Sequence, residues 1–345
     1  MRATVSLIFV LAVSLIWAET AFTGQGGSRE VISAIEKSLP LLQRVGPPFI
    51  ENTGCVSCHH NVLPAMAVAV ARERGLKVDE AVARQNATAI LEKVAAAREK
   101  LLCGVGIPGD ATTASYILMG LAASGQAASS DTDAMVHYLL GKQSEDGRWT
   151  PVAYRPPLEF SDFTTTALAL RAVELYAPQG RAGEVATRRK TASAWLKKTR
   201  ASNNEELVYR LLGLRWANAE RAEIDKAAKG LLASQRSDGG WAQLSGLTSD
   251  AYATGQALVA LNQAGSVAVT DNAYRRGVDF LLKTQNPDGS WQVESRSIPL
   301  QRYFESGFPH KKNQWVSAAG TSWAVMALTL TLPGPQGVQK SFLFD

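Results

Sequence analysis

The feature that most constrains the fold of this chain is a seven-residue pattern, Gln-x-x-Asp-Gly-x-Trp, which occurs at residues 143–149, 235–241 and 285–291. Each copy lies shortly after a Leu-Leu pair and precedes a polar loop and then an Ala-rich or Thr-rich segment. Repeats of this kind indicate stacked helical hairpins, each of which buries its apolar face against its neighbours. Asp-Gly supplies the turn that ends the first helix, the Trp covers the end of that helix, and the Gln amide can bond the backbone groups freed there.

Helical periodicity extends the pattern to hairpins that lack the Trp. Almost no segment shows the alternation of a strand. We expect one all-α domain over residues 28–335, followed by a C-terminal tail at 336–345. Its six hairpins pair residues 31–44 with 61–74, 79–102 with 110–124, 131–143 with 162–177, 187–200 with 204–218, 222–235 with 249–264, and 271–285 with 316–330.

Three aspartates, Asp110, Asp162 and Asp250, stand at the start of predicted second helices. A carboxylate there accepts hydrogen bonds from the free N–H groups of the first turn and interacts favourably with the helix dipole. We therefore expect helix caps at these positions in preference to catalytic acids.

Composition narrows the function classes. The chain has 345 residues, of which 46% are hydrophobic, which is enough for a large core and too much for a disordered chain. Its formal net charge of +5 is spread without long basic runs, so we expect no nucleic-acid partner. Three cysteines are too few for a disulfide scaffold.

The first 21 residues have the pattern of a secretory signal peptide. Arg2 precedes an uncharged stretch rich in Val, Leu and Ile, and small residues follow at Ala18 and Ala21. No other segment is long and apolar enough to cross a bilayer. We expect cleavage of residues 1–21 and a periplasmic or secreted protein without a stable membrane span.

The three repeats resemble the QW repeats of triterpene cyclases, and the hairpin rhythm resembles the wider α/α-toroid group that includes protein prenyltransferase β-subunits. The resemblance covers most of the mature chain and implies an (α/α)6 toroid. Squalene–hopene-type cyclases protonate their substrate with an Asp-x-Asp-Asp motif, which this sequence lacks; its nearest segment is residues 159–166. The resemblance therefore implies the scaffold and not triterpene cyclisation.

A Cys-x-x-Cys-His segment, formed by Cys55, Cys58 and His59, lies in the first predicted hairpin. It resembles the attachment motif of c-type cytochromes, which implies one covalent haem c in a loop at residues 52–60. Two thiols at this spacing can each reach one haem vinyl group, and the next residue, His59, then approaches the iron. His60 is a candidate partner for a haem propionate or a backbone carbonyl.

Two other uses of these side chains stay open. In an oxidising compartment Cys55 and Cys58 can form a structural or redox-active disulfide. Cys55, Cys58 and Cys103, with one of His59 or His60, also make a ligand set for zinc.

The loop of the sixth hairpin, residues 286–315, is the longest of the loops between first and second helices, and such loops are usually functional or mobile. These loops all leave one end of a toroid, and closure places the sixth hairpin beside the first. We therefore expect this loop to cover the haem, with Arg302 near a propionate and His310 as the sixth iron ligand. The alternatives are an open or water-bound site and Met66, and the aromatic residues expected over the haem are Tyr303, Phe304 and Phe308.

Two function classes follow. The first is an exported mono-haem c-type protein on a toroid, which carries out electron transfer or haem-dependent oxidoreduction with an unknown redox partner. The second is a toroid enzyme or binding module for an apolar or glycan ligand, with the cysteines as a zinc or disulfide site and Asp162 or Asp250 as the acid. If the chain is an enzyme, we expect a haem-dependent oxidoreductase rather than a triterpene cyclase.

Overall fold

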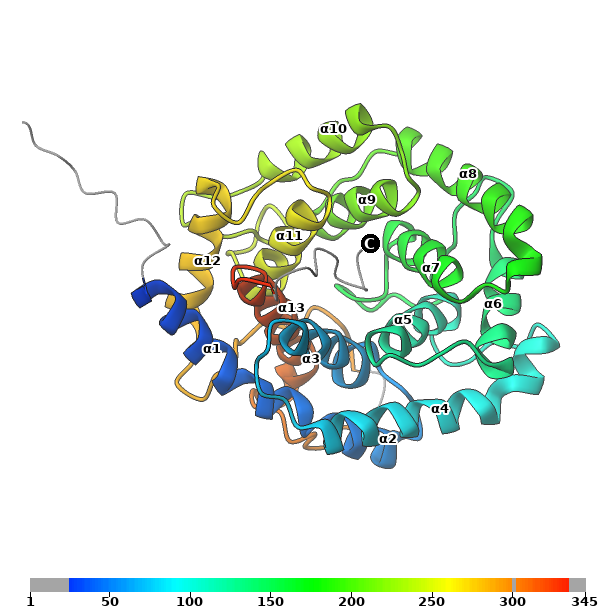
Figure 1. The fold of residues 1–345 in the computed structure, drawn as a ribbon, viewed down its shortest axis with the longest axis horizontal. Helices are drawn as coiled ribbons and strands as arrows, with labels where there is room; N and C mark the ends of the chain where they lie inside the picture. The colour runs from blue at the N-terminus through cyan, green and yellow to red at the C-terminus, as the bar shows by residue number, and fades with distance from the viewer. Residues whose placement is uncertain (1–24, 300–301, 335–345) are drawn as a thin grey trace, which may run out of the picture.

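Two concentric rings of helices make up the computed structural model, which describes residues 25–299 and 302–334 (Figure 1). No strand occurs in these residues; their only ladder pairing is an isolated bridge between Arg155 and Glu159. The inner ring consists of α3 (Leu63–Glu73), α5 (Asp110–Ala123), α7 (Asp162–Tyr176), α9 (Asn204–Trp216), α11 (Ala251–Gln263) and α13 (Gln314–Thr329). The outer ring consists of α1 (Gln25–Gln43), α4 (Glu80–Leu102), α6 (Ser130–Lys142), α8 (Ala182–Lys198), α10 (Arg221–Leu232) and α12 (Asn272–Thr284).

The predicted all-α toroid of six hairpins is therefore confirmed. The helix ends lie within about three residues of the predicted ones, except that α1 and α8 begin about six and five residues earlier than predicted. Each inner helix packs against the next, and α13 packs against α3 to close the ring. One short helix, α2 (Gly46–Thr53), was not predicted and lies in the loop of the first hairpin. The predicted signal peptide at residues 1–21 and the tail at 336–345 lie outside the described residues.

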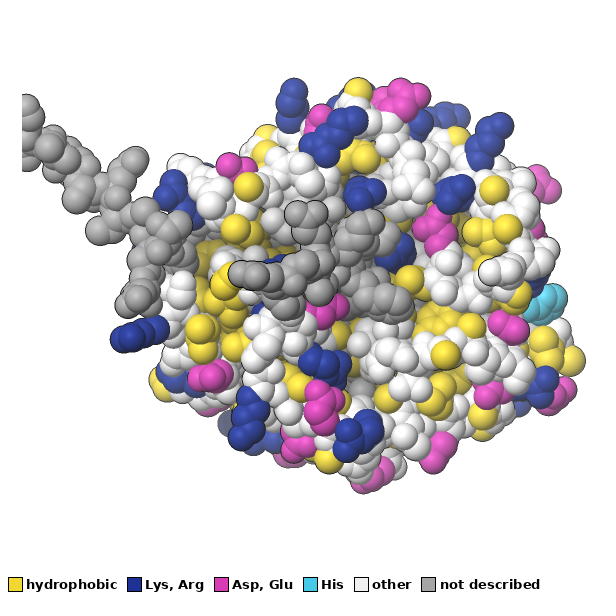
Figure 2. Space-filling view, viewed as in Figure 1, with side chains coloured by type: hydrophobic (Ala, Val, Ile, Leu, Met, Phe, Trp, Pro, Cys, Tyr) yellow, Lys and Arg dark blue, Asp and Glu magenta, His cyan; other side chains and the backbone are white. Residues whose placement is uncertain are grey.

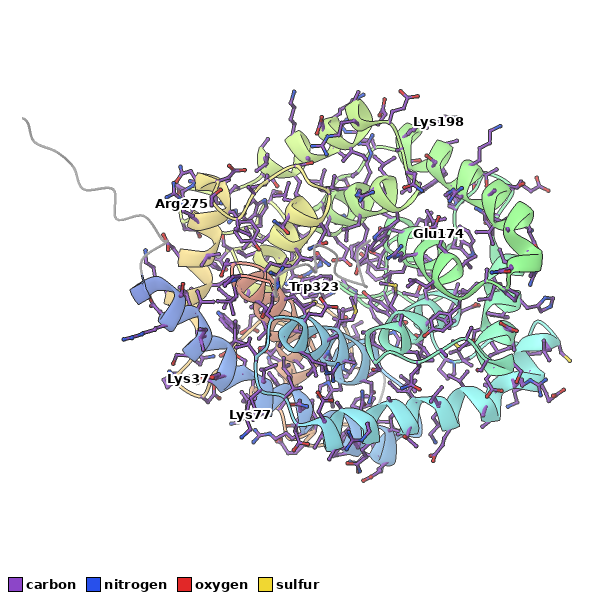
Figure 3. The ribbon with its side chains drawn as sticks, in the orientation of Figure 1. Lys37, Lys77, Glu174, Lys198, Arg275 and Trp323 are labelled. Carbon is purple, nitrogen blue, oxygen red and sulfur yellow. The ribbon has the colours of Figure 1, made fainter. Side chains whose placement is uncertain are left out.

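Burial separates the two rings. Every residue of α13 except Trp315 is buried, whereas α12 buries one stripe, Tyr274, Gly277, Val278 and Leu281. A helix that is apolar all round belongs in a core, and an amphipathic helix belongs at its edge. Figure 3 shows the same division, with Trp323 in the inner ring and Lys198 and Arg275 on outer helices.

Small residues set the spacing of the inner ring. A Cβ atom on Gly255 of α11 would lie 2.5 Å from the backbone carbon of Trp323 in α13. Only glycine allows the two helix backbones to approach so closely. On the face shown in Figure 2, Lys and Arg side chains are interspersed with Asp and Glu around the outer helices.

The three repeats make one hydrogen-bond pattern. Each Trp indole N–H donates to a Leu carbonyl ten residues earlier, near the end of the outer helix, and each Trp backbone N–H donates to a Thr hydroxyl on the paired inner helix. Each Gln amide donates to the Gly carbonyl of its own turn and to a backbone carbonyl of the next outer helix. Each repeat thus joins three helices: the two of its own hairpin and the next outer helix. The sequence predicted only that the repeat ends the first helix of its hairpin.

The third repeat closes the outer ring. Gln285 Nε2 donates to the carbonyl of Ala34 in α1 at 2.8 Å, and Ser38 Oγ donates to the carbonyl of Gly289 at 2.6 Å. These bonds connect the first and last outer helices across 251 residues of sequence.

Only one of the three predicted aspartate caps is present. Asp250 caps α11 and accepts a hydrogen bond from the Ala253 backbone N–H at 2.9 Å. The other two predictions are wrong, because the cap of α7 is Ser161 and the residue before α5 is Gly109. Asp110 and Asp162 are the first residues of these helices.

All loops from outer to inner helices leave the ring at one end, which we call the motif end. Their described residues are 44–62, 103–109, 143–161, 199–203, 233–250, 285–299 and 302–313. No helix among the described residues combines the length and apolarity that a membrane span requires.

Candidate functional site

The Cys-x-x-Cys-His segment leads into a π-helical turn, η1 (Cys58–Val62), directly before α3. Cys58 and His59 are the first two residues of this turn, and Cys55 lies in the loop before it. The Ser57 hydroxyl accepts the His60 backbone N–H at 3.1 Å and starts the turn. Asn61 fixes its position, because its side-chain amide donates to the Gly46 carbonyl at 2.8 Å and to Asn86 Oδ1 at 2.9 Å. The motif is therefore held by α2 and α4 as well as by its own hairpin.

The two histidines form a contacting pair. His59 Nδ1 lies 2.7 Å from His60 Nδ1, and His60 is fully buried while His59 is half-buried. Phe49 lies edge-on to His59 with ring centroids 5.2 Å apart, and Trp315 lies 5.3 Å from His60. Phe304 completes this aromatic cluster, 5.1 Å from Trp315.

The loop of the sixth hairpin lies against the motif, at the place that ring closure predicts. His60 Nε2 lies 2.8 Å from Ser306 Oγ, across 246 residues of sequence. The Ser306 backbone N–H and hydroxyl both donate to Gln314 Oε1, at 2.8 and 2.5 Å. Phe308 is also buried, with its ring 6.4 Å from that of His60. Sequence reasoning missed Ser306 and Gln314, since nothing local marks them.

Three side chains expected over the haem, those of Arg302, Tyr303 and His310, make no hydrogen bond or ring contact with His59 or His60 among the described residues. Arg302 is exposed and has no partner in the part of the chain that the structure describes, and Tyr303 is 52% exposed. His310 Nε2 lies 2.7 Å from Ser290 Oγ in the third repeat, and its backbone has a φ of +82°. The structure thus brings His310 to Ser290 and not to His59. Met66 is buried in α3 at 2% exposure.

The arginine that the structure brings near the motif is Arg155, from the loop of the third hairpin. It pairs with Glu159, which is 5% exposed and accepts a hydrogen bond from Thr113 Oγ1 at 3.0 Å. Burial raises the pKa of Glu159, and the Arg155 charge opposes that rise. Burial first, and then Arg155, lower the pKa of His59 to about 3.

Both histidines are therefore neutral at physiological pH. Burial also lowers the pKa of His60, and it raises the pKa of the Cys58 thiol, which stays protonated. A neutral imidazole with an unprotonated nitrogen is a metal ligand or a base. Among the described residues, His59 Nε2 is the one ring nitrogen of the pair without a hydrogen-bond partner.

Beside Cys55 is a cavity of about 230 Å³ between α4, α5 and the motif. Its walls are mostly apolar, with two lysines on α4; the lining includes Val94, Leu101, Ile107, Ile117, Met135, Lys93 and Lys100. Cys55 is half-exposed toward this space, whereas Cys58 is buried. The residue types of a covalent haem site are thus present here: Cys55 at a cavity, the buried Cys58, and a His59 ring nitrogen without a partner among the described residues. Of these three residues, only Cys55 lines the cavity.

The alternative zinc set is not assembled. Cys103 follows α4 and is exposed, and no group of three or more His, Cys, Asp or Glu side chains among the described residues can hold a metal. Cys55 and Cys58 are both unpaired.

A buried acid that the sequence did not indicate lies inside the ring. Glu205 is 3% exposed and accepts hydrogen bonds from Thr164 Oγ1 at 3.1 Å and Tyr252 OH at 3.0 Å. Burial raises its pKa to about 7. In the sequence Glu205 has only the appearance of an acid in the first turn of a helix.

The two acids proposed from the sequence have structural partners. Asp250 caps α11 and accepts the Gln243 amide at 2.9 Å. Asp162 lies 3.5 Å from Arg148.

Comparisons with known proteins identify the scaffold. Residues 207–332 match the model of the squalene–hopene cyclase C-terminal domain. The lanosterol synthase erg7A of Aspergillus fumigatus is 36% identical over 126 residues, which are 36% of this chain and 16% of that protein. The squalene–hopene cyclase of Bradyrhizobium diazoefficiens is 28% identical over 208 residues, 50% of this chain and 30% of that protein. The chain thus spans less than a third of these relatives.

Solved structures extend the similarity to the whole ring. The type II terpene cyclase MstE from Scytonema, in complex with merosterolic acid A, has a TM-score of 0.55 at 15% identity, covering 89% of this chain and 98% of its own. The ent-copalyl diphosphate synthase of Streptomyces platensis has a TM-score of 0.53 at 19% identity, covering 81% of this chain and 53% of its own. At these identities the likeness is one of fold: a terpene cyclase-like α/α toroid.

Proposed function

We propose that this toroid, a scaffold shared with terpene cyclases, carries one covalent haem c at residues 52–60 and acts as an exported redox protein. One observation carries the proposal. His59 Nε2 is left without a hydrogen-bond partner among the described residues, on a turn that begins at Cys58 and lies three residues after Cys55. An imidazole whose other nitrogen is held by a neighbour is the usual arrangement of a metal ligand.

The chain's own residues have separate roles in this proposal. Cys55 and Cys58 provide the two thioether sulfurs, and His59 provides the iron ligand. The charge of Arg155, which already acts on His59, would offset the charge of a propionate. A bound haem supplies one-electron redox chemistry.

Side chains from two hairpins cover part of the His59 ring. The ring centroid of His59 lies 5.2 Å from that of Phe49 and 5.7 Å from that of Trp315. A dry, apolar surrounding tunes the redox potential of a haem. Because the sequence has no Asp-x-Asp-Asp segment, the proposal does not include acid-initiated cyclisation.

The test is the absorption spectrum of the exported protein, made in a host that attaches haem c. We expect a haem spectrum that changes with dithionite and survives denaturation, for the wild type and for the control Cys103→Ser. The double variant Cys55→Ser/Cys58→Ser should have no such spectrum while its far-ultraviolet circular dichroism stays helical. A colourless wild type refutes the proposal.

A second candidate is the binding of an apolar small molecule, and the cavity beside Cys55 favours it. Its apolar walls and two lysines suit an amphipathic ligand with a negative group. MstE, which shares the fold, was solved with geranylgeranyl dihydroxybenzoate as its substrate. Protein without haem that binds a fatty acid, and loses it in Lys93→Gln/Lys100→Gln, would support this candidate.

A further inference from the structure

The backbone of residues 304–306 fixes the orientation of the Gln314 side-chain amide, and this amide is linked to His60 through Ser306. Gln314 Nε2 donates to the Phe304 carbonyl at 2.7 Å, and Gln314 Oε1 accepts the Ser306 backbone N–H at 2.8 Å. A carbonyl cannot donate and a backbone N–H cannot accept, so the amide has only this orientation. Gln314 therefore presents an acceptor, and only an acceptor, to the Ser306 hydroxyl.

This orientation of Gln314 determines where the Ser306 hydroxyl hydrogen lies. The Ser306 hydroxyl has one hydrogen, which it gives to Gln314 Oε1 at 2.5 Å. Facing His60 Nε2 at 2.8 Å, the same oxygen can then only accept. His60 therefore carries its proton on Nε2.

The last step concerns the two rings. His60 is fully buried among Phe49, Phe308, Trp315 and His59, and no carboxylate hydrogen-bonds to it. A buried imidazolium without a counter-charge is costly, so His60 is neutral and its Nδ1 is a lone pair. At 2.7 Å, His59 Nδ1 must then donate the one proton between the rings.

We infer that Ser306 and Gln314 are positioning residues, which hold His59 as the tautomer protonated on Nδ1 and so keep His59 Nε2 open as the ligating lone pair. The inference rests on the proposed function, because it assigns to the sixth hairpin the control of that ligand. The tautomer of His59 then depends on ring closure, because His59 is in the first hairpin and Ser306 and Gln314 are in the last. A ligand imidazole that donates its second N–H to a neighbour is a stronger electron donor to a metal.

The tautomer is measurable without haem. The full chain, labelled with ¹⁵N-histidine and made in a host that lacks haem attachment, is examined by long-range ¹⁵N–¹H correlation at neutral pH. We expect His59 to be protonated on Nδ1 and His60 on Nε2. In Ser306→Ala, His60 loses its acceptor and the Nε2-protonated form of His59 should appear.

The matched control is Ser322→Ala. Ser322 is also a buried serine of the sixth hairpin, and its hydroxyl donates to the Ala318 carbonyl within α13 at 2.9 Å. This variant should keep the wild-type tautomers. His59 protonated on Nε2 in the wild type, or unchanged tautomers in Ser306→Ala, would overturn the inference.

The reduction potential of the loaded protein gives a second readout. Loss of the hydrogen bond from His60 to Ser306 weakens the donor character of His59 and favours the reduced state. We expect the reduction equilibrium constant of Ser306→Ala to exceed that of Ser322→Ala by about twofold to tenfold, the range of one net hydrogen bond. Equal values for the two variants would overturn the inference. A wild type that acquires no haem refutes the proposed function alone, because the tautomer measurement needs no haem.

Discussion

Replacing Glu205 with Gln should remove a large part of the pH dependence of folding stability. Glu205 is 3% exposed inside the ring and is hydrogen-bonded by Thr164 and Tyr252. Burial raises its pKa from 4.5 to about 7. The native state therefore keeps a proton that the unfolded chain releases over this interval.

The magnitude follows from linkage. One pKa unit corresponds to about 1.4 kcal/mol, so a shift from 4.5 to about 7 is worth about 3 kcal/mol of unfolding free energy. Because the folded pKa is the higher one, this stabilisation is fully present below pH 4.5 and is lost as the pH rises to about 7. Stability from this group thus falls with rising pH.

The assay is urea unfolding followed by circular dichroism between pH 4.5 and 8. We expect the wild type to lose about 3 kcal/mol more than Glu205→Gln across this range. The control is Glu206→Gln, the adjacent half-buried acid, which accepts hydrogen bonds from Ser202. Other raised carboxyls contribute equally to each protein and cancel. Parallel pH profiles for wild type and Glu205→Gln would refute the reasoning.

Two further predictions concern the repeats. Gly239→Ala should cost more than about 1 kcal/mol of unfolding free energy, because Gly239 has a φ of +87° and a Cβ there would lie 2.4 Å from the Arg276 carbonyl oxygen. The control Gly246→Ala, at a position with open space, should cost almost nothing in the same urea titration. Equal costs for the two variants would contradict the argument. Gln285→Ala removes the bond to the Ala34 carbonyl, so hydrogen exchange of α1 should accelerate by about fivefold or more, and unchanged exchange would show that this bond does not hold the ring closed.

The fold was predictable because its signals are local. The Asp-Gly turns and the apolar periodicity identify each hairpin without knowledge of its neighbours, and all six predicted helix pairs are present. The aspartate caps failed at two positions, and at Asp162 the reason is equally local. Ser161 lies one residue before Asp162 and its hydroxyl accepts the Phe163 N–H, so that serine takes the cap.

The site was predictable only in part, since it joins the two ends of the chain. The Cys-x-x-Cys-His segment and the approach of the sixth hairpin follow from spacing and topology. Which side chain of that loop contacts the motif depends on backbone torsion, and the positive φ of His310 accompanies a contact with Ser290. Ser306 reaches His60 across 246 residues, and no local pattern reports such a contact.

Intact-mass analysis of the exported protein tests the central claim most directly. The chain made in a haem-attaching host should carry the added mass of one haem, and peptide mapping should place it on residues 52–60, at Cys55 and Cys58. Cys103→Ser should carry the same mass, and Cys55→Ser/Cys58→Ser should carry none. A wild type of unmodified mass from a host that loads a control cytochrome would contradict the account.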